Sequence, residues 1–251
     1  MRQTEMNTAA SFKKKSTESA GLLFRKYFVF LVGLMIVACG ICLITKAGLG
    51  TSPASAVAYV TSLKYPFLSF GTTTFVLNVL IFGMEWLLLG NKFDMTQRIG
   101  QIPATLAFSI VTDFWMNVLS FIPEMNFFGS LMIFVLGCAV LGFGVVIELA
   151  PDVLKVPADG LTNAISVHFS LSLGTSKNLQ DLTFCLMGGL LSWIFFGGLR
   201  GVGLGTILSA ILVGRFVALF RKILPVQKLF ESTSANDGLT FDPDDVQSVG
   251  A

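Results

Sequence analysis

The chain has 251 residues, of which 53% are hydrophobic and only 13% are charged, and its formal net charge is +2 at pH 7. The apolar share is higher and the charged share lower than in soluble globular domains, so an ordinary soluble domain is excluded. The small net charge gives no reason to expect a nucleic-acid partner. We therefore expect an all-α polytopic protein whose main partner is the lipid bilayer.

Nearly uninterrupted apolar runs recur along the chain, each close to the roughly 20 residues that a helix needs to cross a bilayer. They cover residues 27–45, 72–90, 99–119, 128–147, 179–198 and 202–220. Six membrane-spanning helices are therefore predicted. The first 20 residues lack the apolar core of a signal peptide, so we expect the N-terminus to stay attached.

Two further apolar segments, residues 52–63 and 157–171, are shorter than a regular spanning helix. Each opens with a proline near its first turn, where a missing backbone N–H is tolerated because it would have no partner in the helix. Ser55 or Asp159 in that turn can accept hydrogen bonds from free N–H groups. Both segments are therefore predicted to form short, proline-headed helices, and the simplest role of Asp159 is to cap the second one.

The sequence also repeats itself at a nearly constant distance. A shift of 104 residues lays Gly33, Gly40, Pro53 and Ala54 over Gly137, Gly144, Pro157 and Ala158. A shift of 103 matches Gly71-Thr72 with Gly174-Thr175, and one of 102 places Asp113-Phe114 over Arg215-Phe216. The shifts predict two copies of one unit, although membrane helices also share small residues without duplication.

The predicted copies are residues 23–122 and 126–224. Each contains a spanning helix, a short proline-headed helix and two more spanning helices, so each repeat has three crossings. The polar segments 1–22 and 229–251 are expected to be mobile tails.

The distribution of Lys and Arg bears on whether the short helices cross the membrane. If both cross, Lys92, Arg98 and Lys155 lie outside, which the positive-inside rule disfavours; if both re-enter, these residues are cytoplasmic. Both arrangements keep the basic N-terminal tail and the Arg221-Lys222 end cytoplasmic. The re-entrant arrangement fits better, and with three crossings per copy it inverts the second copy. Inverted repeats with interrupted helices are a recurrent plan of secondary transporters, which bind substrate near the midplane.

Ionisable residues inside spans are candidates for a binding site, because a charge at the bilayer centre costs roughly 2.5 to 3.5 kcal/mol. Asp159 and Arg215 could form a functional pair; in the structural alternative, Asp159 only caps its helix and Arg215 snorkels to the cytoplasmic face. Asp113 holds in the first copy the place of Arg215 in the second. These two could meet across a pseudo-two-fold axis, or each could lie near an interface. Glu148 leads into the second short helix and is a further candidate.

Polar uncharged residues gather at the same joints. Asn163 follows Asp159 by four residues and shares its helical face. The first copy offers Thr51, Ser52 and Ser55 at its short helix. Backbone or hinge roles are expected for the glycines and prolines at these joints: Gly48, Gly50, Pro53, Pro157, Gly160, Gly203 and Gly205.

Catalytic and metal-binding patterns are not expected in this chain. The single histidine, His168, excludes a multi-histidine metal site, and no nucleophile-elbow sequence surrounds any serine. The glycines of residues 201–205 lack the lysine of a phosphate-binding loop. We therefore expect no enzyme activity, no metal and no cofactor.

The segments AGLGTSPAS, KVPADGLTNAIS, LSFGTTTF, LSLGTSKN and GVGLGTILSAILVGRFV together resemble the YczE/YitT-like bacterial integral membrane proteins, over roughly residues 27–222. The first copy departs from the second at Ser55, where the second has Asp159. The resemblance implies a bacterial inner (plasma) membrane location and no particular substrate.

The leading functional hypothesis is a transporter or permease for a small anionic or zwitterionic solute, bound at the interface of the repeats. The alternatives are a non-transporting membrane factor that acts in biosynthesis or regulation through a partner protein, and the membrane-embedded binding subunit of a larger importer. Gly33, Gly137, Gly142 and Gly144 would permit close contacts either in a homo-oligomer or within one chain.

Overall fold

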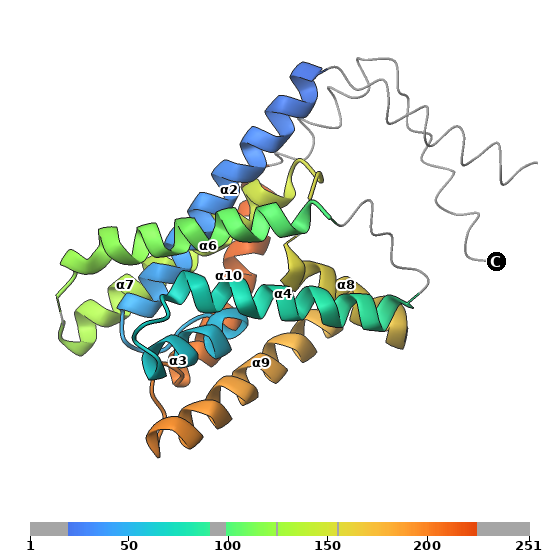
Figure 1. Ribbon diagram of the computed structural model, residues 1–251. Coiled ribbons are helices and arrows are strands. Elements are labelled where there is room, and N and C mark those ends of the chain that lie inside the picture. Colours follow the sequence, from blue (N-terminus) through green and yellow to red (C-terminus); the bar gives the residue numbers. More distant parts are fainter. Residues whose placement is uncertain (1–19, 91–98, 124, 155, 225–251) are drawn as a thin grey trace, which may run out of the picture.

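The computed structural model describes residues 20–90, 99–123, 125–154 and 156–224, and this part of the chain is helical without strands (Figure 1). The predicted tails, 1–22 and 229–251, lie outside the described residues, except that the first helix already begins at Ala20. Lys92, Arg98 and Lys155, which decided the predicted topology, also lie outside them.

The long helices are α2 (Ala20–Lys46), α4 (Phe70–Leu89), α6 (Gln101–Val118), α7 (Phe127–Leu149), α9 (Leu173–Phe196) and α10 (Leu204–Ile223). A 3₁₀ turn, η3 (Leu119–Phe121), extends α6. Within the described residues, six helices are long and apolar enough to cross a membrane, which confirms the predicted number. The short helices are η1 (Pro53–Ser55), which continues into α3 (Ala56–Lys64), and α8 (Pro157–Phe169). Long, short, long, long is therefore the element order in both halves.

Side-chain polarity is distributed as in a protein surrounded by lipid. Large apolar side chains face outward, such as Leu87, which is 80% exposed, whereas Glu85 on the same helix is completely buried. Buried polar residues on α6 follow the helical period at Gln101, Thr105 and Ser109. A lipid environment accounts for this pattern, because hydrocarbon solvates the apolar faces and polar groups must find partners inside the protein.

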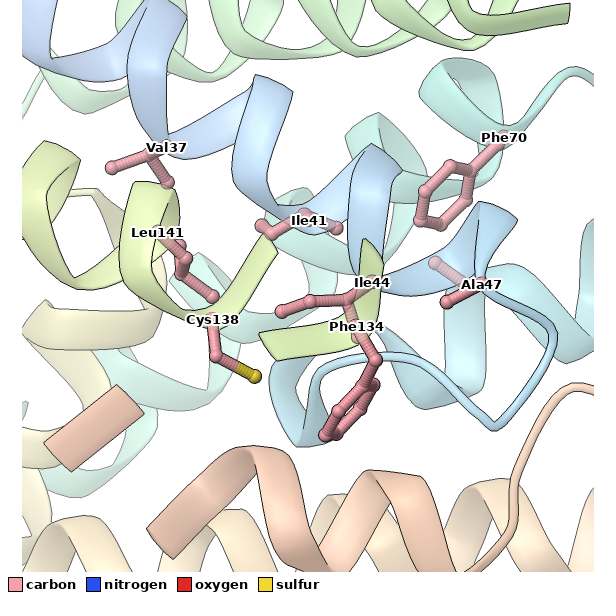
Figure 2. Packing of buried hydrophobic residues seen from close by; sticks show 9 residues of the cluster. Val37, Ile41, Ile44, Ala47, Phe70, Phe134, Cys138 and Leu141 are labelled. Atoms are coloured by element: carbon pink, nitrogen blue, oxygen red, sulfur yellow. The ribbon is translucent and has the colours of Figure 1, made fainter. Parts of the chain in front are cut away.

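The helices α2 and α7 form the centre of the bundle and run antiparallel. Each close contact joins a glycine of one helix to a residue of the other, because only glycine lets the two backbones approach so closely. The contacts join Gly33 to Glu148, Gly40 to Leu141, Gly137 to Ile44 and Gly144 to Val37. A Cβ atom at Gly144 would lie 2.6 Å from the backbone nitrogen of Val37, well inside van der Waals contact. Figure 2 shows the apolar side chains that pack around this seam, among them Ile41 of α2 and Leu141 of α7.

The 104-residue shift seen in the sequence converts each of these contacts into another one of the set. Adding 104 to 33 gives 137, and subtracting 104 from 148 gives 44, so the pair Gly33–Glu148 becomes Gly137–Ile44. The pair Gly40–Leu141 becomes Gly144–Val37 in the same way. The glycines named as candidates for oligomer contacts are thus used within one chain; the fourth, Gly142, packs against Phe216 of α10.

The first short helix begins inside the bundle. Ala56 lies against Gly188, which precedes the end of α9 by eight residues, or about 12 Å at 1.5 Å per residue. From there α3 runs outward: Tyr65, just after its end, packs edge-on against Phe195 near the end of α9, with ring centroids 6.0 Å apart. The helix therefore returns to the face of the bundle where α9 ends and α4 begins.

The second short helix does the same at the other end. Gln180, seven residues or about 10 Å into α9, donates from Nε2 to the carbonyl of Ala158 in the first turn of α8, at 2.9 Å. Near the other end of α8, His168 Nδ1 lies 3.0 Å from the carbonyl oxygen of Leu88, at the end of α4. Figure 1 shows α3 and α8 beside opposite ends of α4.

Two names for the ends of the bundle follow from this path. We call the end where α2 begins and α10 ends the terminal face, and the other end the opposite face. The short helix α8 ends at the terminal face, and α3 ends at the opposite face.

Candidate functional site

The start of α8 brings polar groups into the interior of the bundle. Val156 precedes the helix, Pro157 takes its first position, and Asp159 lies in the first turn, where a carboxylate is favoured by the positive end of the helix dipole. The amides of Asp159 and Gly160 both donate to the Val156 carbonyl at 3.0 Å. Pro157 therefore begins the helix as predicted, and Asp159 belongs to its first turn rather than to the N-cap position.

Acidic side chains of two other helices lie near this turn, which itself carries Asp159. A Cβ atom at Gly160 would lie 2.5 Å from a carboxylate oxygen of Glu85, so the absence of a side chain there makes room for the acid of α4. Glu148, near the end of α7, is 5% exposed, and Asp159 is near enough to interact with it electrostatically. Asp159 itself is partly buried. Among the described residues, no three His, Cys, Asp or Glu side chains form a group that could hold a metal ion.

Gln180 fixes the same turn from α9. Its Oε1 accepts a hydrogen bond from Thr162 at 2.7 Å, while its Nε2 donates to Ala158, so one amide spans the first turn and a half of α8. Asn163 is partly buried on the neighbouring position of the helix. The sequence reasoning missed Gln180; the available signal was a long amide inside an otherwise apolar span.

The residues predicted at the first short helix form a hydrogen-bonded joint. Ser52 donates to Ser55 at 3.0 Å, and the hydroxyl oxygens of Thr45 and Thr51 are 2.7 Å apart. The amide of Thr51 donates to Thr206 Oγ1 at 3.2 Å, which ties this joint to the start of α10.

The predicted hinge glycines lie in this joint and have different surroundings. Gly50 has a φ of 141° and faces Thr206, and Gly205 donates to the Leu49 carbonyl at 3.1 Å, which leaves no space for a side chain at either position. Gly203 is close to Leu49 as well. Gly48 has a φ of 74° and open space around it, so it supplies a turn that other residues rarely adopt.

Removing the acceptor at Thr206 is expected to weaken the fold. Thr206→Val keeps the shape but leaves the buried amide of Thr51 without its oxygen, so the free energy of unfolding should fall by about 1 to 3 kcal/mol. A lower melting temperature in detergent, followed by tryptophan fluorescence, measures the effect. Thr183→Val is the matched control, because Thr183 is exposed and bonds within its own helix. Equal melting temperatures for the two variants would show that the hydrogen bond from the Thr51 amide to Thr206 does not stabilise the fold.

Asp113 and Arg215 lie toward opposite ends of the bundle. Asp113 accepts hydrogen bonds from the Ser69 hydroxyl at 2.5 Å and from the Gly71 amide at 2.6 Å, at the start of α4 on the opposite face. Arg215 is exposed, eight residues before the end of α10 at the terminal face. The structure therefore does not bring these two charges together, because Asp113 bonds to the start of α4 and Arg215 is exposed on α10. Each lies toward a face instead.

The predicted site residues thus fall into separate places. Asp159, Asn163 and Glu148 gather at the start of α8, and Thr51, Ser52 and Ser55 at the start of η1. Between the two starts lies an apolar cluster of Ile81, Leu161 and Phe184, against which Ala54 and Val57 pack. Arg215 is on α10, which packs against α7, whereas α8 packs against α4 and α9.

Comparison with known proteins finds a matching family and similar bacterial sequences. Residues 24–222 match a family of unknown function, DUF6198. An "Uncharacterized protein" of Haemophilus influenzae is 26% identical over 201 residues, 80% of this chain and 85% of the relative. The "Uncharacterized protein YyaS" and the "Uncharacterized membrane protein YczE" of Bacillus subtilis are each 29% identical, over 79% and 76% of this chain and 94% and 83% of their own lengths. No solved structure matches the chain significantly. The predicted YczE-like resemblance is confirmed.

Proposed function

The chain belongs to the family of unknown function DUF6198, and from its architecture we propose that it is a secondary transporter for a small zwitterionic solute. One observation carries the proposal: two proline-headed helices start inside the bundle and leave it at opposite faces. Helices that begin inside the membrane direct their free amides and positive dipole ends toward the protein centre, as in many secondary transporters.

The duplication supports the same interpretation. The α2–α7 contacts follow the 104-residue shift, and the contacts of the short helices follow shifts of 104 and 103 residues. The pair Ala56–Gly188 corresponds to Gly160–Glu85, since 56 plus 104 is 160 and 188 minus 103 is 85. Two copies in inverted orientation would present equivalent surfaces to the two sides of the membrane, which is what alternating access requires.

The acidic side chains near α8 favour a zwitterion over a simple anion. Glu85, Glu148 and Asp159 can attract an ammonium group, whereas the start of α8 offers a positive dipole end to a carboxylate. A solute with both groups, such as an amino acid, would satisfy both partners. An anion alone would meet three carboxylates.

We propose that the protein lies in a bacterial inner membrane with both termini on the cytoplasmic side. Exposed basic residues at the terminal face, Arg25 on α2 and Arg221 and Lys222 on α10, support this orientation through the positive-inside rule.

A second function is favoured by the packing between the short helices. The cluster of Ile81, Leu161 and Phe184 fills the space between their starts with apolar side chains. A membrane factor that acts through a partner protein would need a solid centre of this kind and no solute path. The binding experiment below separates the two functions.

The test begins with the protein purified from its native membrane. Mass spectrometry would identify a copurifying solute, and the same compound added back should raise the melting temperature. Asp159→Asn should abolish that increase while the protein still accumulates in the membrane, because the substitution removes one attractive charge and little volume. Asp181→Asn is the control, since Asp181 pairs with Lys177 on the surface of α9 at 3.1 Å.

One outcome would change the deciding variant, and another would contradict the proposal. If Asp159→Asn fails to fold, Asp159 has a structural role, and Glu148→Gln then becomes the deciding variant. If no zwitterion binds the wild-type protein or enters proteoliposomes, the non-transporting function is favoured.

A further inference from the structure

Two helix pairs occupy corresponding places in the two halves: α4 with α6, and α9 with α10. Their first turns are built alike. Ser69 accepts from the Thr72 amide at 3.0 Å, and Ser172 accepts from the Thr175 amide at 3.1 Å. In both turns the serine and threonine hydroxyls are 2.8 Å apart. The starts of α4 and α9 are therefore equivalent surfaces, one at each face of the bundle.

The first pair is closed at the opposite face. Asp113 of α6 accepts from the Ser69 hydroxyl and the Gly71 amide, so its carboxylate holds the start of α4. Gly71 also lies directly against the Ser109 carbonyl, where a Cβ atom would overlap it. Hydrogen bonds to an ionised carboxylate are stronger than neutral ones, and the helix dipole adds to them. The helices α4 and α6 pack closely together.

The second pair lacks this closure at the terminal face. A Cβ atom at Gly174, the counterpart of Gly71, would meet nothing within 4 Å. The counterpart of Asp113 is Arg215, which is exposed. The helices α9 and α10 contact each other only slightly. Two copies of one unit thus have different conformations, one closed and one apart.

We propose that Asp113 is the latch of a gate, and that the structure is the state closed at the opposite face and open at the terminal face. Release of Asp113 from the start of α4 would separate α4 from α6 while α9 closes on α10. The inference rests on the proposed transport function, which requires two such states. Its basis is that the starts of α4 and α9 are built alike, so α9 can pack against α10 as α4 packs against α6, although without an acid in the place of Asp113.

Distances between spin labels test the latch in the full chain with its four cysteines replaced. One pair of labels, at the exposed positions 67 and 121, reports on the opposite face; another, at the exposed positions 173 and 223, reports on the terminal face. Asp113→Ala is expected to lengthen the first distance by several ångströms and to shorten the second. Ser172→Ala is the control: it removes the cap of α9 without touching the latch, and it should leave the first distance unchanged.

The reciprocal change distinguishes a gate from a local cap. If Asp113→Ala lengthens the first distance but leaves the second as in the wild type, Asp113 only fastens one helix end and the proposal falls. If neither distance changes, the latch does not hold the pair and the proposal falls as well. Uptake of radiolabelled amino acids into proteoliposomes is measured separately. If the two distances change reciprocally but no uptake occurs, the gate is supported and the transport function is rejected. If uptake occurs but the distances do not change, the transport function is supported and the gate is rejected.

Discussion

Replacing Gly40 by valine is expected to prevent the protein from accumulating in folded form. Gly40 lies where α2 meets α7, and a Cβ atom there would overlap the backbone nitrogen and Cα of Leu141. Backbone atoms cannot move aside as the end of a flexible side chain can, so the two central helices would have to separate. Overpacking typically costs 1 to 3 kcal/mol, and we expect about 3 kcal/mol or more at this seam. The measurement is the yield of monodisperse protein after detergent extraction, together with its melting temperature.

The same substitution at Gly83 is the matched control. Gly83 is also inside a spanning helix, but a Cβ atom there would meet nothing within 4 Å, so Gly83→Val should fold as well as the wild type. Removing the side chain opposite should give no rescue: Gly40→Val with Leu141→Ala should remain unfolded, because the overlap is with the backbone. A well-folded Gly40→Val protein would show that α2 and α7 are not packed as described.

The helices themselves could be predicted from the sequence because their signals are local. Apolar runs set the six spans, and Pro53 and Pro157 mark the two short helices within a residue of where they begin. The matching glycines were visible for a different reason. Gly33, Gly40, Gly137 and Gly144 share a spacing of seven residues, and each proves to face the other helix of the central pair. Their spacing reflects one contact surface used twice.

The partners of the polar residues could not be predicted in this way. Thr51 bonds to Thr206, 155 residues away, and Asp113 bonds to the start of α4, 42 residues away from Gly71. A single sequence states that such groups need partners but does not say which ones, because the choice depends on how distant helices are placed. Glu85 illustrates the same limit. It is completely buried against Gly160, a partner 75 residues away that its own helix does not reveal.

The starts of α4 and α9 have the same sequence pattern, but the charged residue associated with each of them has the opposite sign. Ser69-x-Gly71-Thr72 and Ser172-x-Gly174-Thr175 form matching helix starts, but the position of Asp113 on α6 is taken by Arg215 on α10. A carboxylate is attracted by the positive end of a helix, whereas a guanidinium is repelled by it. Asp113 therefore stabilises the contact of α6 with the start of α4. In the proposed gate, Arg215 would oppose closure of the second pair, and this difference would give the protein a preferred state rather than two states of equal stability.

Reversing that charge is expected to close the second pair. Arg215→Asp places a carboxylate at the position equivalent to Asp113, where it can accept from the Ser172 hydroxyl and the Gly174 amide once α10 approaches α9. The distance between labels at positions 173 and 223 should shorten by several ångströms. With Asp113 still in place, both faces would then be latched, so uptake into proteoliposomes should be lost. Combining Arg215→Asp with Asp113→Ala should lengthen the distance between positions 67 and 121, as Asp113→Ala does alone.

The control for this result is Arg215→Ala, which removes the repulsion without supplying a latch. If the shortening comes from the new carboxylate, Arg215→Ala should shorten the distance between positions 173 and 223 far less than Arg215→Asp does. Arg221→Asp makes the same charge change near the end of α10 and should leave that distance unchanged. Equal distances in Arg215→Ala and Arg215→Asp would mean that residue 215 does not face the start of α9 in any populated state. The correspondence between Asp113 and Arg215 would then be one of sequence position alone, and the gate would have to be closed by other residues.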